Sequence, residues 1–166
     1  MMEMRPELAN LYEVWQQAGR EGRLPSRADI GPEALKPWLR NVALIDVERA
    51  PLRFRRRLVG TKIVDYHGAD RTGQYLSERE SETIDSRFYE DYVACATRGI
   101  AVHRAERSCD AAGNTIRWER VLLPLARNGR DPDMILVGLY RDVLHRRPSL
   151  PLRLPRVDRL VAHGAA

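Results

Sequence analysis

Long apolar runs, cysteines and lysines are all scarce in this sequence of 166 residues. No apolar run approaches the roughly 20 residues that a membrane-spanning helix needs, and the first residues lead into no signal-peptide core. The two cysteines, Cys95 and Cys109, are fourteen positions apart and fit neither a disulfide framework nor a Cys-x-x-Cys metal or redox motif. We therefore expect a cytoplasmic protein with reduced thiols, no metal site and no membrane association.

Recognisable catalytic motifs are also missing. The sequence has no His-Glu-x-x-His and no Gly-x-Ser-x-Gly motif, and no cysteine or serine stands at a telling spacing from a histidine. Any of the four histidines, His67, His103, His145 and His163, could meet a carboxylate in space, but a chain this rich in charge offers such pairs by chance. The protein is not expected to be an enzyme, and a small uncharacterised enzyme is kept as an alternative.

The net charge of +5 is concentrated near one end of the chain. Residues 141–166 contribute +4, so the other 140 residues contribute only +1. Nucleic-acid binding through this basic tail would be weak and steeply salt-dependent, and neither a recognition helix nor an aromatic stacking platform supports it. Nucleic-acid binding is therefore an alternative function that we do not favour.

The length of the chain suits one sizeable hydrophobic core with extensions. We assign residues 1–22 to an N-terminal helix, residues 23–143 to the main domain and residues 144–166 to a basic, proline-containing tail. The helix places Leu8, Leu11, Tyr12 and Trp15 on one stripe, at the i, i+3, i+4, i+7 spacing of an amphipathic helix. This stripe either packs on its own domain or forms a dimer or partner surface with a second copy.

Periodicity in the main domain predicts two early strands, two helices and a final meander. Strands are expected over 41–47 and 52–59, a short helix over Thr61–His67 capped by the Thr61 hydroxyl, and a longer helix over 83–98. After residue 100 the apolar period changes to two, which predicts strands over 101–109, 115–126 and 133–143. The fold class is α+β: a five-stranded antiparallel sheet with helices packed on one face, plus an N-terminal amphipathic helix.

Arginines dominate one face of the second expected strand. Simple alternation places Arg53, Arg55 and Arg57 on one face and Phe54 and Arg56 on the other. Aligned arginines are usually a solvated face that also protects an edge strand from pairing. A guanidinium also matches a carboxylate in a bidentate manner, so Arg57 is kept as a candidate for an anion or carboxylate site.

The order of elements and several short stretches resemble a PAS domain, and more specifically a family of single-domain PAS-like proteins of alphaproteobacteria. The stretches that carry the resemblance, which covers about residues 7–143, are Leu24–Ile30, Phe54–Thr61, Gly68, Thr72, Gly73, Glu119–Leu125 and Met134–Leu136. Flavin-binding PAS photoreceptors carry a reactive cysteine in a motif before the long helix, but residues 70–82 contain no cysteine. Haem-binding PAS sensors place a histidine on the long helix, and residues 83–98 contain none. No cofactor is expected.

The resemblance implies a regulatory sensory or interaction module that binds a small ligand, a protein partner or both. A homodimer and a protein signalling partner are expected, because no effector domain is recognisable in the chain. The pocket would lie between the inner face of the sheet and residues 61–73 and 83–98. Its candidate ligand-binding residues are Tyr66, His67, Phe88, Tyr92, Trp118 and Arg57, with the direction of the Trp118 face left open.

Overall fold

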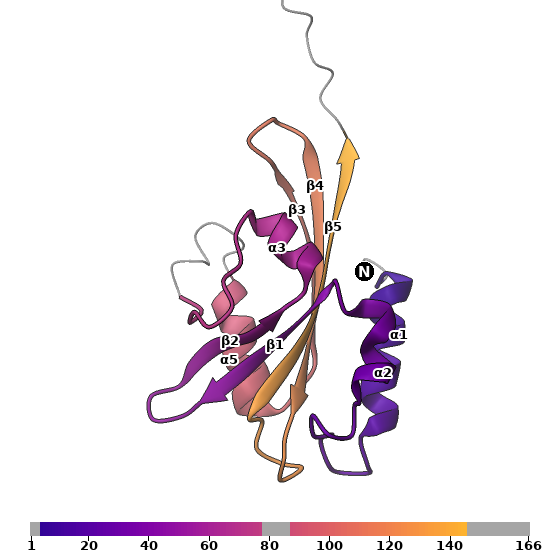
Figure 1. The fold of residues 1–166 in the computed structure, drawn as a ribbon, viewed down its shortest axis with the longest axis vertical. Helices are drawn as coiled ribbons and strands as arrows, with labels where there is room; N and C mark the ends of the chain where they lie inside the picture. The colour runs from indigo at the N-terminus through magenta and orange to yellow at the C-terminus, as the bar shows by residue number, and fades with distance from the viewer. Residues whose placement is uncertain (1–3, 78–86, 146–166) are drawn as a thin grey trace, which may run out of the picture.

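The structure, a computed structural model, describes residues 4–77 and 87–145. In these ranges the chain forms one antiparallel sheet with the strand order β2-β1-β5-β4-β3 (Figure 1). The elements are α1 (Pro6–Ala18), α2 (Pro32–Leu35), η1 (Lys36–Trp38), β1 (Val42–Glu48), β2 (Arg53–Val59), α3 (Thr61–His67), α5 (Phe88–Arg98), β3 (Val102–Cys109), β4 (Thr115–Leu125) and β5 (Met134–His145). The expected five-stranded α+β fold is confirmed.

Helices cover both faces of the sheet. Figure 1 shows α3 and α5 on one side of the strands and α1 and α2 on the other. The sheet has a hydrophobic core on each face, and strand β1 contributes side chains to both. Ala43 and Ile45 pack in the core beneath α3 and α5, whereas Val42 and Leu44 pack in the core beneath α1. A strand that is covered on both sides reads as a continuous apolar run, as Val42–Ile45 does.

The apolar stripe of α1 packs on the sheet of its own chain. Leu8 and Leu11 are fully buried, and a β-carbon on Gly138 of β5 would come within 2.8 Å of both side chains. The indole N–H of Trp15 donates to the carbonyl of Pro124 over 2.8 Å, and Tyr12 stacks on Trp15 with 5.6 Å between ring centroids. Of the two predicted roles of the stripe, packing on its own domain holds for Leu8 and Leu11, and a dimer or partner surface at the half-buried Tyr12 and Trp15 stays a prediction.

A buried carboxylate fixes the start of α1. Glu119 is 1% exposed. Its Oε1 accepts a hydrogen bond from the backbone N–H of Arg5 over 2.8 Å and lies 3.0 Å from Nε2 of His103. Its Oε2 accepts a hydrogen bond from Nη2 of Arg117 over 2.6 Å. These contacts join α1 to β3 and β4, which explains how a charged side chain is accommodated beneath the helix.

Most element boundaries predicted from the sequence lie within two residues of those observed. One local detail was wrong: Gly60, and not Thr61, is the N-cap of α3, and no side-chain hydrogen bond caps this helix. The beginning of the long helix predicted over 83–98 falls partly outside the described residues, as does most of the 144–166 tail. Within the described ranges, no helix is long and apolar enough to cross a membrane.

Candidate functional site

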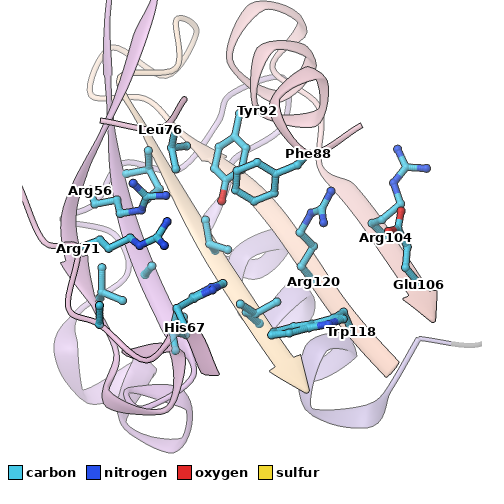
Figure 2. Close-up of a pocket in the computed structure, with 17 residues that line it drawn as sticks. Arg56, His67, Arg71, Leu76, Phe88, Tyr92, Arg104, Glu106, Trp118 and Arg120 are labelled. Atoms are coloured by element: carbon cyan, nitrogen blue, oxygen red, sulfur yellow. The ribbon is translucent and has the colours of Figure 1, made fainter. Parts of the chain in front are cut away.

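A cavity lies between the sheet and the helices α3 and α5 (Figure 2). Every strand of the sheet contributes to it, together with both helices and the loop after α3. The lining residues are Ala43, Ile45, Arg56, Val59, Ile63, His67, Ala69, Arg71, Leu76, Phe88, Tyr92, Arg104, Glu106, Trp118, Arg120, Val137 and Leu139. It has a volume of about 70 Å³. One water molecule needs about 10–15 Å³ of such space, so roughly five to seven non-hydrogen atoms fit inside.

Aromatic rings form one part of the wall. The ring of His67 stacks on Trp118 with 5.9 Å between centroids and 14° between planes. The ring of Tyr66 meets the same indole edge-on, with 5.8 Å between centroids. On α5, the rings of Phe88 and Tyr92 lie one turn apart, with 5.1 Å between centroids. Rings at these separations attract one another beyond simple burial, so Trp118 is held in place from the α3 side.

The start of helix α3 lies close to the backbone that leads into β1 because the helix begins at a glycine. A β-carbon on Gly60 would lie 2.5 Å from the carbonyl oxygen of Arg40 and 2.6 Å from that of Leu39. The helix ends at Gly68, which adopts the left-handed conformation with φ of 70°. Two glycines therefore set both ends of the turn that directs His67 into the cavity.

A β-bulge in β2 brings Val59, and not Leu58, to the same face as Arg56 and into the cavity. The register of β2 against β1 shifts between Leu44 and Ile45, and Arg57 is the extra residue opposite this shift. Beyond the bulge the alternation changes phase, so that Arg56 and Val59 both line the cavity. Arg56 is 9% exposed.

The other arginines of β2 form the solvated face that was expected. Arg57 has a side chain that is 61% exposed and pairs with Asp46, its Nη1 lying 3.4 Å from Oδ1. Arg55 also pairs with Asp46, at 3.0 Å, and Arg53 pairs with Glu48 at 2.8 Å. The predicted ligand-binding residue Arg57 therefore lies outside the cavity lining, to which its neighbour Arg56 belongs.

The loop after α3 is tied to the edge of β2 beside Arg56. The N–H of Gly73 donates to the carbonyl of Arg56 over 2.6 Å, and the N–H of Arg56 donates to the carbonyl of Gln74 over 2.9 Å. The guanidinium of Arg56 donates from Nη1 to the carbonyl of Tyr75 at 3.1 Å. In Figure 2, Arg56 and Arg71 extend from this wall toward the interior of the cavity.

On the opposite wall, Asp91 of α5 holds two arginines of the sheet. Asp91 is 6% exposed, and its Oδ2 accepts a hydrogen bond from Nη2 of Arg120 over 2.7 Å. Arg104 donates to the same carboxylate from Nη2 (2.6 Å) and Nε (3.1 Å). The guanidinium of Arg120 also lies 5.3 Å from the centre of the Phe88 ring. Arg120 thus lines the cavity and also joins the sheet to α5 through the carboxylate of Asp91.

A model of the PAS domain family matches residues 2–140. This chain belongs to the PAS domain family. The crystal structure of the Rhodobacter sphaeroides LOV protein resembles this PAS domain with a TM-score of 0.46 and 14% identity, over 81% of this chain and 67% of that chain. The structure of an RNA-binding light-oxygen-voltage receptor resembles it with a TM-score of 0.46 and 19% identity, over 70% of this chain and 35% of that chain. At these identities the likeness concerns the fold alone. No curated protein matches the chain significantly.

Four of the six predicted ligand-binding residues line the cavity of this PAS domain: His67, Phe88, Tyr92 and Trp118. The face of Trp118 therefore looks inward. Tyr66 is not among the lining residues. Its hydroxyl accepts a hydrogen bond from the side-chain amide of Asn41 over 3.2 Å.

The sequence interpretation missed the charged lining residues Arg56, Arg71, Arg104, Glu106 and Arg120. Alternation along the strands already placed Arg120 beside Trp118 and Arg56 beside Phe54, so both could have been chosen. Arg71 comes from an irregular loop, where no periodic pattern indicates direction.

The described lining of the cavity offers no thiol and no cluster of metal ligands. No cysteine is among the described lining residues. Cys95 is fully buried in α5, and burial raises the pKa of its thiol to about 12, which keeps it in the unreactive protonated form. No group of three or more His, Cys, Asp or Glu within 4–77 and 87–145 could hold a metal ion. The site is built from arginines, aromatic rings and aliphatic side chains.

Proposed function

We propose that this PAS domain is a sensory module that binds a small molecule in the cavity between the sheet and helices α3 and α5. The observation that carries the proposal is the mixed lining of this cavity, which combines an aliphatic floor with aromatic rings and buried charged groups. Ligand sites typically have this composition, because apolar surface supplies affinity and a few polar groups fix orientation. The role is binding rather than catalysis.

Occupancy would be communicated through the contact between Arg120 and α5. Arg120 lines the cavity and is bonded to Asp91, which lies on the helix. A ligand that attracts or displaces this guanidinium changes the restraint on α5, and therefore the relative populations of its packing arrangements. We propose that a partner protein, or a second copy of the chain, reads this change on the outer surface of the domain.

Native mass spectrometry of the freshly purified protein, followed by a thermal-shift screen of small metabolites, tests the binding function. Ala69 is exposed and lines the mouth of the cavity, so Ala69→Trp should block entry without disturbing the core. Ala111 is exposed in the turn between β3 and β4, away from the cavity lining, and Ala111→Trp is the matched control.

We expect a retained molecule, or a compound that raises the melting temperature, in the wild type and Ala111→Trp but not in Ala69→Trp. The proposal fails if no compound stabilises the wild type, or if Ala69→Trp responds as strongly as the wild type.

A further inference from the structure

We propose that the ligand of this cavity is a small uncharged molecule built on one aromatic ring, which lies on the aliphatic floor of the sheet between Phe88 and Trp118. This inference rests on the proposed binding function and specifies the chemical class of the ligand. Four features of the described lining carry it: the aliphatic floor, the engagement of the charged residues, the placement of the aromatic rings and the volume.

A strip of aliphatic side chains crosses three strands and forms the floor of the cavity. Ala43 of β1 lies opposite Val59 of β2 on one side and opposite Val137 of β5 on the other, and all three line the cavity. Ala43 has the shortest side chain of the three, so the strip is lowest at β1. A ligand that covers this strip is favoured when its own surface is apolar.

The charged residues of the described lining all have interaction partners within the protein: Arg56, Arg71, Arg104, Glu106 and Arg120. The carboxylate of Asp91, for example, binds Arg104 over 2.6 Å and Arg120 over 2.7 Å. A charged ligand would compete for these groups and would also lose its own hydration on entering the cavity. An uncharged ligand requires none of the charged groups to change partner.

Aromatic rings stand on two sides of the cavity. Figure 2 shows Phe88 and Tyr92 of α5 on one side, and His67 stacked on Trp118 on the other. A ligand ring between these pairs can meet them edge-on or offset, and aromatic rings in these arrangements attract one another beyond simple burial. An aromatic ring also attracts a guanidinium without taking its hydrogen bonds. It can therefore act on Arg120, as the proposed function requires, while the bond to Asp91 remains.

The volume of the cavity limits the ligand to a single ring. About 70 Å³ holds roughly five to seven non-hydrogen atoms, which corresponds to one benzene ring with at most a small substituent. Phenol and aniline meet this limit and are uncharged at neutral pH. Fused two-ring compounds exceed it.

The experiment is an NMR titration of the folded, full-length protein at neutral pH with phenol and aniline. Cyclohexanol is the saturated counterpart of phenol, N-methylpyridinium is a charged ring of the same size, and butanoate is a small anion. We expect phenol or aniline to bind about five-fold or more tightly than each of these three probes, because only the uncharged aromatic ring gains the ring contacts without displacing a charged group.

Three variants locate the binding. Ala43→Ile adds bulk at the lowest point of the floor and should abolish the binding of phenol. Trp118→Leu removes one wall ring and keeps an apolar side chain, so it should weaken phenol about three-fold or more and cyclohexanol less than two-fold. Tyr12→Leu removes a ring from the core on the opposite face of the sheet and should change neither affinity. If Trp118→Leu does not fold, Phe88→Leu carries the same comparison.

The outcomes separate this inference from the proposed function. If cyclohexanol or butanoate binds as tightly as phenol and Ala69→Trp abolishes that binding, the cavity is a ligand site but the aromatic inference is wrong. The inference is also wrong if Tyr12→Leu weakens phenol as much as Trp118→Leu, or if Ala43→Ile binds phenol as the wild type does. If no probe binds and no molecule is retained on purification, both proposals fall together.

Discussion

Replacing Asp91 by asparagine removes the negative charge that joins α5 to the sheet. The side chains of Asp91 and Arg120 are 8% and 7% exposed, and their contact is 2.7 Å. Removing one partner of a buried ion pair typically costs about 3–5 kcal/mol, because the remaining charge stays buried without compensation. The asparagine amide keeps an acceptor oxygen, and Arg104, with a side chain 27% exposed, is partly solvated. We therefore expect a loss at the lower end, about 3 kcal/mol.

Urea denaturation followed by circular dichroism measures this change as a shift of the midpoint at constant slope. The matched control is Glu33→Gln, which removes the same charge from an exposed pair with Lys36, where the two atoms are 3.9 Å apart and the side chains 92% and 75% exposed. This control should leave the midpoint unchanged.

A second variant separates the ion pair from other effects of the substitution. In a double-mutant cycle of Asp91→Asn with Arg120→Met, we expect the two losses to be non-additive by about 1–3 kcal/mol. A loss below about 1 kcal/mol for Asp91→Asn, or additive effects in the cycle, would refute the assignment of this contact as a stabilising link between α5 and the sheet.

Three further predictions concern other parts of the domain. Gly60→Ala should cost about 2 kcal/mol or more by thermal unfolding, since its β-carbon would meet a backbone carbonyl oxygen at 2.5 Å. Burial raises the pKa of Cys95 from 9.0 to about 12, so the unfolded chain releases this proton first and stability should fall as the pH rises above about 9, by up to ~1.4 kcal/mol per pH unit. Cys95→Ala should remove that part of the slope. Glu119→Gln should cost about 3 kcal/mol and accelerate amide exchange at the start of α1, because Glu119 accepts the Arg5 N–H.

Each of these predictions has a contrasting case. Gly31→Ala, where the added carbon meets nothing within 4 Å, should leave the melting temperature within a degree or two. Equal losses for Gly60→Ala and Gly31→Ala would argue against the steric explanation. An unchanged pH slope in Cys95→Ala would show that other groups control alkaline unfolding. Uniformly faster exchange in Glu119→Gln, instead of a change centred on α1, would remove the local role of this carboxylate.

Much of the fold follows from patterns that act over a few residues. Apolar alternation predicted all five strands, and Gly60 and Gly68 marked the two ends of α3. These signals are readable because backbone propensity and side-chain periodicity are local properties of the chain. The aromatic lining was predictable for the same reason, since His67 and Trp118 lie on elements whose positions the pattern determines.

Alternation failed at β2, where the register against β1 shifts beside Arg57. A single extra residue reverses the direction of the side chains that follow it, and the extra residue exists only in relation to the neighbouring strand. Choosing Val59 over Leu58 therefore required the paired sheet, whereas alternation alone already placed Arg56 and Arg57 on opposite faces. The irregular loop that brings Arg71 to the cavity carried no periodic signal at all.

The sequence by itself determined that the chain forms a five-stranded antiparallel sheet, and that one stripe of its first helix, including Leu8 and Leu11, must be buried. Only the tertiary structure decided what buries that stripe, which is the chain's own sheet at Gly138. It also decided that Arg71, which an irregular loop carries, enters the cavity. The physical reason is that burial of apolar surface is favourable against any complementary surface. An apolar stripe therefore indicates that a helix face is buried, but it does not indicate which surface buries it.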